Sequence, residues 1–340
     1  MKNSARHIAI ETLPFILGVL ALALVRALHT SAQEKAPLRL VQTIALPNVE
    51  GRIDHLAVDL QGQRLFLAAL GNNTLEVIDL KAGRVIHSIK GLREPQGLAF
   101  IPEANAVYVA NGVDGSCEAF AADSFAPLRG VKFSGDADNL RYDAATKLLY
   151  VGYGDGALGV FEANTGKIIG HIALPAHPEA FTLEQSGARI FVNVPRAKQV
   201  AVIDRQRRAV VAHWPITQAA ANYPLALDEA QHRLFIGCRQ PARLLVLDTD
   251  SGKVVAQVEC AGDMDDVFYD AKNKRVYVSG GAGFISVFAQ LNADQYQAVA
   301  QLSTAPGART SLFVPALGRL YLAVPHRGGQ AAEVRVYETQ

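Results

Sequence analysis

The sequence predicts an all-β fold, a seven-bladed β-propeller built from four-stranded antiparallel blades. The apolar tetrapeptide Leu65-Phe66-Leu67-Ala68 returns six more times, and successive copies start 42, 42, 41, 44, 42 and 44 residues apart. A period in the low forties made of short strands is typical of propeller blades. Composition agrees, because 50% of the residues are hydrophobic and only 19% are charged, which suits a compact protein whose strands are mostly buried. The later copies begin at Val107, Leu149, Ile190, Leu234, Val276 and Leu320.

The third copy shows the four strands of one blade most clearly. Residues 148–152 form the strongest apolar run, as expected for a strand that is covered on both faces. Glycine-containing turns at 154–156 and 164–167 separate the runs that follow. We therefore expect four antiparallel strands joined by hairpins, at 139–143, 148–152, 158–161 and 168–172.

The last blade lacks a fourth strand after its third strand at 334–337. Residues 38–46, which precede the first copy, resemble the fourth strands at 85–89 and 210–214. We expect this N-terminal strand to complete the last blade and to close the ring through main-chain hydrogen bonds. Each repeat has an apolar face that only its neighbours can cover, so residues 33–340 are predicted to form a single domain.

Residues 1–32 have the pattern of a signal peptide. A cationic start with Lys2 and Arg6 precedes an uncharged apolar run at 13–25, and small residues end at Ala32, where we predict cleavage. The run is shorter than the roughly 20 residues of a comfortable membrane span. We expect a periplasmic or secreted protein, and contact with a membrane only under the alternative that the leader stays uncleaved as an anchor. Three cysteines, Cys117, Cys238 and Cys260, are too few for a disulfide framework.

Charge argues against a nucleic-acid partner. The formal net charge is +1, and removal of residues 1–32 takes away three basic residues and one acidic residue, which leaves about −1. No basic stripe stands out along the chain, so binding to phosphates has no electrostatic support. Two basic turns, at 239–243 and 325–329, are expected to carry solvated loop charges, with contact to a partner as the alternative.

The strands at 107–111 (VYVAN), 149–154 (LYVGYG) and 276–281 (VYVSGG) resemble the YVTN repeats of a group of bacterial propellers, often called the YncE-like family. The resemblance covers residues 38–338. It implies the propeller fold in an exported protein and is weak for activity. More distant relatives by fold include the propellers of nitrite reductases, nitrous-oxide reductases, amine dehydrogenases and lactonases, and the fold does not choose among them.

The residues where the innermost strands begin are the candidate site, because function in propellers usually sits at one mouth of the central channel. The repeat aligns these starts, and four of the seven equivalent positions carry a carboxylate. Converging carboxylates raise one another's pKa unless a cation neutralises them. The predicted ligand-binding residues are Arg52, Asp54, His55, Gln96, Asp138, Asn139, Arg141, Glu179, Asn222, Tyr223, Asp265, Asp266 and Arg309.

Three uses of this ring remain open from the sequence. The polar side chains tie neighbouring blades together, bind an organic ligand, or hold a divalent ion. Oxygen ligands favour Ca²⁺ or Mg²⁺, for which Glu179, Asp265 and Asp138 are the candidates. Arginines of the ring, among them Arg52, Arg141 and Arg309, are the internal way to neutralise the carboxylates.

Several chemistries are excluded by missing motifs. The sequence has no Cys-x-x-Cys-His for covalent haem, too few histidines near the mouth for a copper cluster, and a single tryptophan, Trp214, where quinone-dependent propellers (PQQ) have many. Neither Gly-x-Ser-x-Gly nor His-Glu-x-x-His occurs. The predicted function is a monomeric, non-catalytic propeller that binds a small molecule or a periplasmic protein. The alternatives are a divalent-metal-dependent hydrolase or lactonase, and a scaffold subunit of a periplasmic redox enzyme.

Overall fold

The computed structural model describes residues 36–340, so the predicted leader lies outside the described residues. Residues 37–340 form one compact unit of seven four-stranded antiparallel sheets, which confirms the predicted fold class. Neighbouring innermost strands contact one another all the way round, including β2 with β26, so the sheets close into a ring. Within this part of the chain no helix has the length and apolarity needed to cross a membrane.

The blades follow one another along the chain, and each runs from its innermost to its outermost strand. Blade 1 comprises β2 (Leu56–Asp59), β3 (Arg64–Ala69), β4 (Thr74–Asp79) and β5 (Arg84–Lys90). Blade 2 comprises β6 (Pro95–Ile101), β7 (Ala106–Asn111), β8 (Ser116–Ala121) and β9 (Pro127–Lys132). Blade 3 comprises β10 (Leu140–Asp143), β11 (Leu148–Tyr153), β12 (Ala157–Glu162) and β13 (Ile168–Ala173), which confirms the predicted strands.

The remaining blades have the same order. Blade 4 comprises β14 (Phe181–Leu183), β15 (Arg189–Val194), β16 (Gln199–Asp204) and β17 (Ala209–Pro215). Blade 5 comprises β18 (Ala220–Asp228), β19 (Arg233–Gln240), β20 (Ala242–Asp248) and β21 (Val254–Glu259). Blade 6 comprises β22 (Met264–Asp270), β23 (Arg275–Gly280), β24 (Phe284–Asn292) and β25 (Gln295–Ser303). Blade 7 comprises β26 (Ser311–Val314), β27 (Arg319–Val324), β28 (Glu333–Thr339) and β1 (Leu38–Ala45). Short 3-10 turns are η1 (Leu70–Asn72), η2 (Pro102–Ala104), η3 (Pro195–Ala197) and η4 (Pro315–Leu317).

Burial along each blade follows the sequence pattern. The repeated tetrapeptides lie in the second strands, and in β3 every residue from Leu65 to Ala69 is buried because both faces are covered by adjacent blades. The outermost strand β17 instead alternates between exposed and partly buried residues, as a strand with one solvated face does. Continuous apolar runs therefore mark the inside of a blade, and alternation marks its outer edge.

Seven apolar clusters hold the ring together, one in each interface between adjacent blades. The cluster between blades 1 and 2, for example, contains Phe66 and Leu75 from one blade and Leu98 and Val107 from the next. Equivalent clusters fill the other six interfaces. Because each apolar cluster is shared by two adjacent blades, the seven blades are expected to depend on one another for stability.

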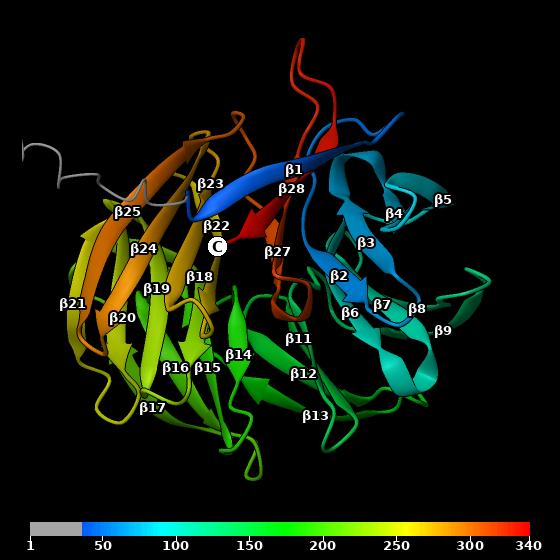
Figure 1. Cartoon of the computed structure of the whole chain (residues 1–340). Coiled ribbons are helices and arrows are strands. Elements are labelled where there is room, and N and C mark those ends of the chain that lie inside the picture. Colours follow the sequence, from blue (N-terminus) through cyan, green and yellow to red (C-terminus); the bar gives the residue numbers. More distant parts are fainter. Residues whose placement is uncertain (1–35) are drawn as a thin grey trace, which may run out of the picture. The chain divides into compact units, whose positions relative to one another are not determined.

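The N-terminal strand closes the ring as predicted. In Figure 1 the blue strand β1 lies alongside the red strand β28, and the two pair antiparallel from Leu38 opposite Thr339 to Ala45 opposite Glu333. Leu38 enters the cluster between blades 6 and 7, whereas Ile44 enters the cluster between blades 7 and 1. One strand thus anchors both interfaces of the last blade.

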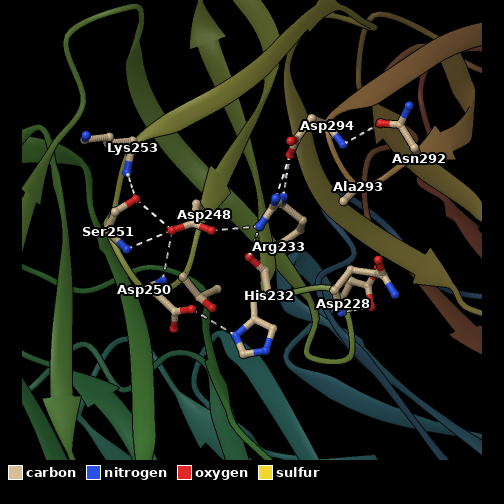
Figure 2. A network of polar contacts seen from close by, with 12 residues as sticks. Asp228, His232, Arg233, Asp248, Asp250, Ser251, Lys253, Asn292, Ala293 and Asp294 are labelled. Atoms are coloured by element: carbon tan, nitrogen blue, oxygen red, sulfur yellow. Dashed lines mark hydrogen bonds and ion pairs between the residues drawn. The ribbon is translucent and has the colours of Figure 1, made fainter.

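Polar contacts add a tie between blades 5 and 6. Arg233, at the beginning of β19, donates hydrogen bonds to Asp248 of its own blade over 2.8 Å and to Asp294, in the β24–β25 turn of blade 6, over 2.8 Å (Figure 2). Asp248 also accepts three hydrogen bonds from the backbone and side chain of the β20–β21 turn. Arg233 is mostly buried, so this bridge fixes the relative position of two blades at the rim where β18 ends. All three cysteines are free.

Candidate functional site at the channel mouth

One cavity of about 350 Å³ lies where the innermost strands begin. Ten of the thirteen predicted residues line it, and every blade or the loop leading into it contributes at least one of them. The lining residues are Arg52, Asp54, His55, Gln96, Asp136, Asp138, Asn139, His177, Glu179, Ala180, Pro195, Arg196, Tyr223, Arg239, Asp265 and Arg309. We call this space the mouth cavity.

The same backbone contact positions the acidic residues of three blades. The amide of Asp54 donates to the carbonyl of Ala68 over 2.8 Å, and the amide of Asp138 donates to that of Gly152 over 2.9 Å. In blade 4 the amide of Glu179 donates to the carbonyl of Asn193, in the second strand, over 3.0 Å. Each carboxylate therefore lies two residues before its inner strand, at an equivalent place in its blade, because the repeat fixes the backbone and leaves the side chain free to vary.

Three predicted residues lie elsewhere. Asn222 is fully buried, and its amide donates to the side chain of Asn193 over 2.9 Å, so it ties blade 5 to blade 4. Arg141 and Asp266 lie deeper and line a second, mainly apolar cavity of about 340 Å³, formed by inner strands. His55 is the one residue that lines both cavities. A count along the sequence places all three residues at the mouth, because it does not give depth along the channel.

Asp265 is held between two arginines. Arg239 donates to Oδ1 of Asp265 over 2.6 Å, and Nε of Arg309 lies 2.9 Å from its Oδ2. Arg239 also donates to the carbonyl of Met264 over 2.8 Å, and its guanidinium lies 3.8 Å from the centre of the Tyr223 ring. Both carboxylate oxygens and one aromatic face are thus already occupied.

The expectation of a solvated loop charge was wrong for Arg239. Strand β19 extends as far as Gln240 and runs antiparallel to β18, so its last residues return to the rim where β18 begins. Pro195 and Arg196 reach the mouth in the same way, just after β15. These residues, together with Asp136 and Ala180, are outside the predicted set, because an alignment of the starts of the first strands does not include the ends of the second strands.

Other carboxylates of the mouth lack such partners. Asp54 is 4% exposed and has Arg52 at 3.6 Å, whereas Asp138, 7% exposed, accepts a single hydrogen bond of 3.3 Å from Asn139. Glu179 forms no ion pair within the described residues. Burial, followed by the charges of Asp138 and Asp265, raises the pKa of Glu179 to about 8. Burial likewise raises the pKa of Asp138 to about 6, against the opposing charge of His55.

Asn139 leaves a buried acceptor unused. The residue is 3% exposed, its amide nitrogen donates to Asp138, and its Oδ1 has no hydrogen-bond partner among the described residues. A buried carbonyl oxygen without a donor costs about 1–3 kcal/mol. Because Asn139 lines the mouth cavity, the orphaned oxygen and the two under-neutralised carboxylates occur in one place.

His55 and Asp266 form the junction between the two cavities. The imidazole Nδ1 lies 3.8 Å from Oδ1 of Asp266, whose other oxygen accepts a 2.7 Å hydrogen bond from the amide of Ser311. Burial disfavours a charged imidazole, but Asp54, Asp266, Asp138 and Asp265 outweigh it and raise the pKa of His55. Burial raises the pKa of Asp266 to about 7 even though His55 opposes the shift.

The arrangement gives limited support to a metal. Among residues 36–340 no group of three or more His, Cys, Asp or Glu side chains is arranged to hold an ion. Asp265, one of the predicted ligands, already has both oxygens bound by arginines, whereas among the described residues Asp138 accepts one hydrogen bond and Glu179 forms no ion pair. The Ca²⁺ or Mg²⁺ site stays a prediction.

Comparison with known proteins identifies the fold and no particular relative. No protein-family model matches the sequence, and no curated protein matches it. A chain of hydrazine synthase from Kuenenia stuttgartiensis is similar in structure, with a TM-score of 0.73, 15% identity, and coverage of 83% of this chain and 94% of that chain. A chain of the mitotic checkpoint complex has a TM-score of 0.74, 12% identity, and coverage of 88% and 91%.

These similarities define the class of the protein, a seven-bladed β-propeller. In all, 1805 chains of solved structures match. The sequence identities of the two described above, 15% and 12%, are too low to indicate an activity for this chain. Function therefore has to be argued from the side chains of the mouth cavity.

Proposed function

We propose that this chain is an exported, non-catalytic propeller that binds a small polar ligand, or a polar part of a partner protein, in the mouth cavity. The observation that carries the proposal is that all seven blades or their entry loops direct polar side chains into one open cavity of ligand size. The proposal includes membership of the YVTN-repeat propellers, supported by the motifs at 107–111 and 276–281. Export is supported by the leader pattern at 1–32.

A plug in the cavity tests ligand binding without changing charge. Gln96 lines the mouth and donates to Asp136 over 3.2 Å, so Gln96→Trp would fill part of the space. Gln297→Trp on the exposed face of β25 is the matched control. A thermal-shift screen of metabolites should yield compounds that stabilise the wild type and Gln297→Trp but not Gln96→Trp. Compounds that stabilise all three proteins equally, or a screen with no binder, would refute binding of a small ligand at the mouth.

A hydrolase is the second candidate, and Glu179 favours it. A carboxyl group with a pKa of about 8 stays protonated near neutral pH, as a general acid must. Lactone and ester panels with Ca²⁺ or EDTA test this candidate. Turnover that is lost in Glu179→Gln and kept in Glu259→Gln, a change on the exposed outer strand β21, would support it. The same turnover in both variants would remove Glu179 from any such mechanism.

A further inference from the structure

We propose that the ligand of the mouth cavity is a small organic cation with a primary ammonium group, seated against Asp138, Glu179 and Asn139. This inference rests on the proposed function, because it names the chemical class of the ligand that the cavity would bind. It follows from the balance of charge, the balance of hydrogen-bonding groups and the volume of the cavity.

When the carboxyl groups of the cavity are ionised and His55 is neutral, the charge that is left after internal pairing is negative. Five carboxylates and four guanidinium groups line the cavity, but Arg239 and Arg309 are both used by Asp265. Arg52 and Arg196 are exposed at the rim, and only Arg52 approaches a lining carboxylate, at 3.6 Å from Asp54. The arginines are thus concentrated on one carboxylate, and the interior of the cavity keeps under-neutralised acid groups.

The unused hydrogen-bonding capacity consists of acceptors. Asn139 is only 3% exposed, and its buried Oδ1, which has no partner among the described residues, needs a donor. Asp138 accepts only one weak hydrogen bond of 3.3 Å, and no hydrogen bond to the Glu179 carboxylate is formed within the described residues. A primary ammonium carries three donors and no acceptor, so it can supply both the charge and the hydrogen bonds that are missing.

The cavity favours an organic ammonium over a bare metal ion. A volume of about 350 Å³ accommodates a molecule of several heavy atoms. Calcium needs six to eight oxygen ligands, whereas a primary ammonium needs about three acceptors. A quaternary ammonium would be a poorer ligand, because such groups have no N–H donors and are recognised by open aromatic faces. Here Arg239 already covers a face of Tyr223.

Protonation gives the proposal an independent readout. The charges of Asp138, Asp265, Arg239 and Asp54 affect the pKa of Glu179. Those of His55, Asp54 and His177 affect the pKa of Asp138. Because burial holds the pKa of both carboxyl groups above the ordinary value, each must lose a proton to bind a cation. A primary amine keeps its charge up to about pH 10. Binding should therefore tighten from pH 6 to pH 8 and release protons.

The test is calorimetric titration of the full chain with 1,4-diaminobutane, choline, acetate, glucose and CaCl₂ in turn. We expect 1,4-diaminobutane to bind with proton release, choline to bind at least about tenfold more weakly, and acetate and glucose not to bind. Asp138→Asn and Glu179→Gln should each weaken the diamine about tenfold or more, which corresponds to one lost charge-assisted hydrogen bond. Glu259→Gln, a neutralised carboxylate on the exposed outer strand, should leave affinity unchanged.

The outcomes separate this inference from the proposed function. Binding of acetate, glucose or another neutral or anionic compound that Gln96→Trp blocks, without diamine binding, would overturn the cation and keep the ligand site. A Ca²⁺ signal that Glu179→Gln abolishes, again without diamine binding, would assign the cavity to a metal and overturn the inference. Diamine affinity that is equal in all carboxylate variants would show surface attraction only. Failure of every compound in the wild type would overturn this inference, whereas the proposed function is overturned for small ligands only when the metabolite screen also yields no binder.

Discussion

Replacement of Asp266 by asparagine should reduce the protein's loss of stability between pH 5 and pH 8. Asp266 lies on β22 at the junction of the two cavities, where its side chain is 15% exposed and has Nδ1 of His55 at 3.8 Å. Burial raises its pKa from 3.8 to about 7. Asparagine has nearly the same shape, and its Oδ1 can keep the 2.7 Å hydrogen bond from Ser311. The substitution therefore removes the ionisation of Asp266, and with it a charge that helps to raise the pKa of His55, while it keeps the shape of the side chain and the contact with Ser311.

The sign and size of the effect follow from proton linkage. The folded protein holds the proton of Asp266 more tightly than the unfolded chain does, so folding is favoured below the unfolded pKa and this advantage is lost as pH rises through the folded pKa. With pKa values of 3.8 and about 7, the free energy of unfolding should fall by about 2–3 kcal/mol between pH 5 and pH 8 from this group alone. His55, Asp138 and Glu179 have raised pKa values and act in the same direction.

Urea denaturation at pH 5, 6, 7 and 8 measures this slope. Asp266→Asn should lose about 2–3 kcal/mol less than the wild type over that range, while Asp155→Asn, at an exposed turn, should follow the wild type. Carboxyl groups with lowered pKa values act in the opposite direction, but they are the same in the wild type and the variant and cancel in the comparison; they are Asp114, Glu229, Asp248 and Glu338. Parallel stability curves for Asp266→Asn and the wild type would show that Asp266 is ionised throughout and would refute the reasoning.

Three further perturbations test the ring and the mouth. Arg239→Ala should lower the free energy of unfolding, measured by urea denaturation, by about 3 kcal/mol because it leaves Asp265 with one partner. The exposed control Arg207→Ala should lower it by less than about 1 kcal/mol. Equal losses would contradict a stabilising contact between Arg239 and Asp265. Deletion of residues 38–46 removes the buried side chains of Leu38, Ile44 and Leu46. Since burial of each contributes about 1.5–3 kcal/mol, the melting temperature of the whole ring should fall. An unchanged melting temperature would disprove closure of the ring by this strand. Gly97→Ala places a Cβ 2.2 Å from the carbonyl oxygen of Asp138 and should lower stability, measured by thermal denaturation, by about 1–3 kcal/mol. Gly329→Ala, whose Cβ would lie in open space, is the control. Equal melting temperatures for the two variants would contradict the close approach of Gly97 to Asp138.

The sequence was sufficient for the architecture because the blade repeat is a backbone property. Buried second strands recur at a nearly constant period, and each recurrence fixes the hairpins around it. The alternation of β17 and the apolar run of β3 differ for a physical reason, since one strand is solvated and the other is covered on both faces. Closure by β1 also followed, because a three-stranded last blade would leave an unpaired edge.

The mouth was predicted less completely, because two kinds of information are missing from a count along the first strands. The first is the return of the second strand: Arg239 lies five residues after the start of its tetrapeptide, and Pro195 occupies the equivalent position in blade 4. Extending the same alignment to that position would have found both. The second is depth, since Asp265 and Asp266 are adjacent in sequence but line different cavities. Depth depends on the pleat and on neighbouring blades, and no repeat encodes it.

The two candidate functions make opposite demands on Glu179. As a seat for an ammonium group it must be ionised, so affinity should rise as pH increases toward and beyond its pKa of about 8. As a general acid it must be protonated, so turnover should fall over the same range. Glu179→Gln weakens both functions and cannot separate them, whereas the sign of the pH dependence can. Because His55 also loses charge as pH rises, its effect on a bound cation has the same sign as that of Glu179, and the two contributions reinforce one another.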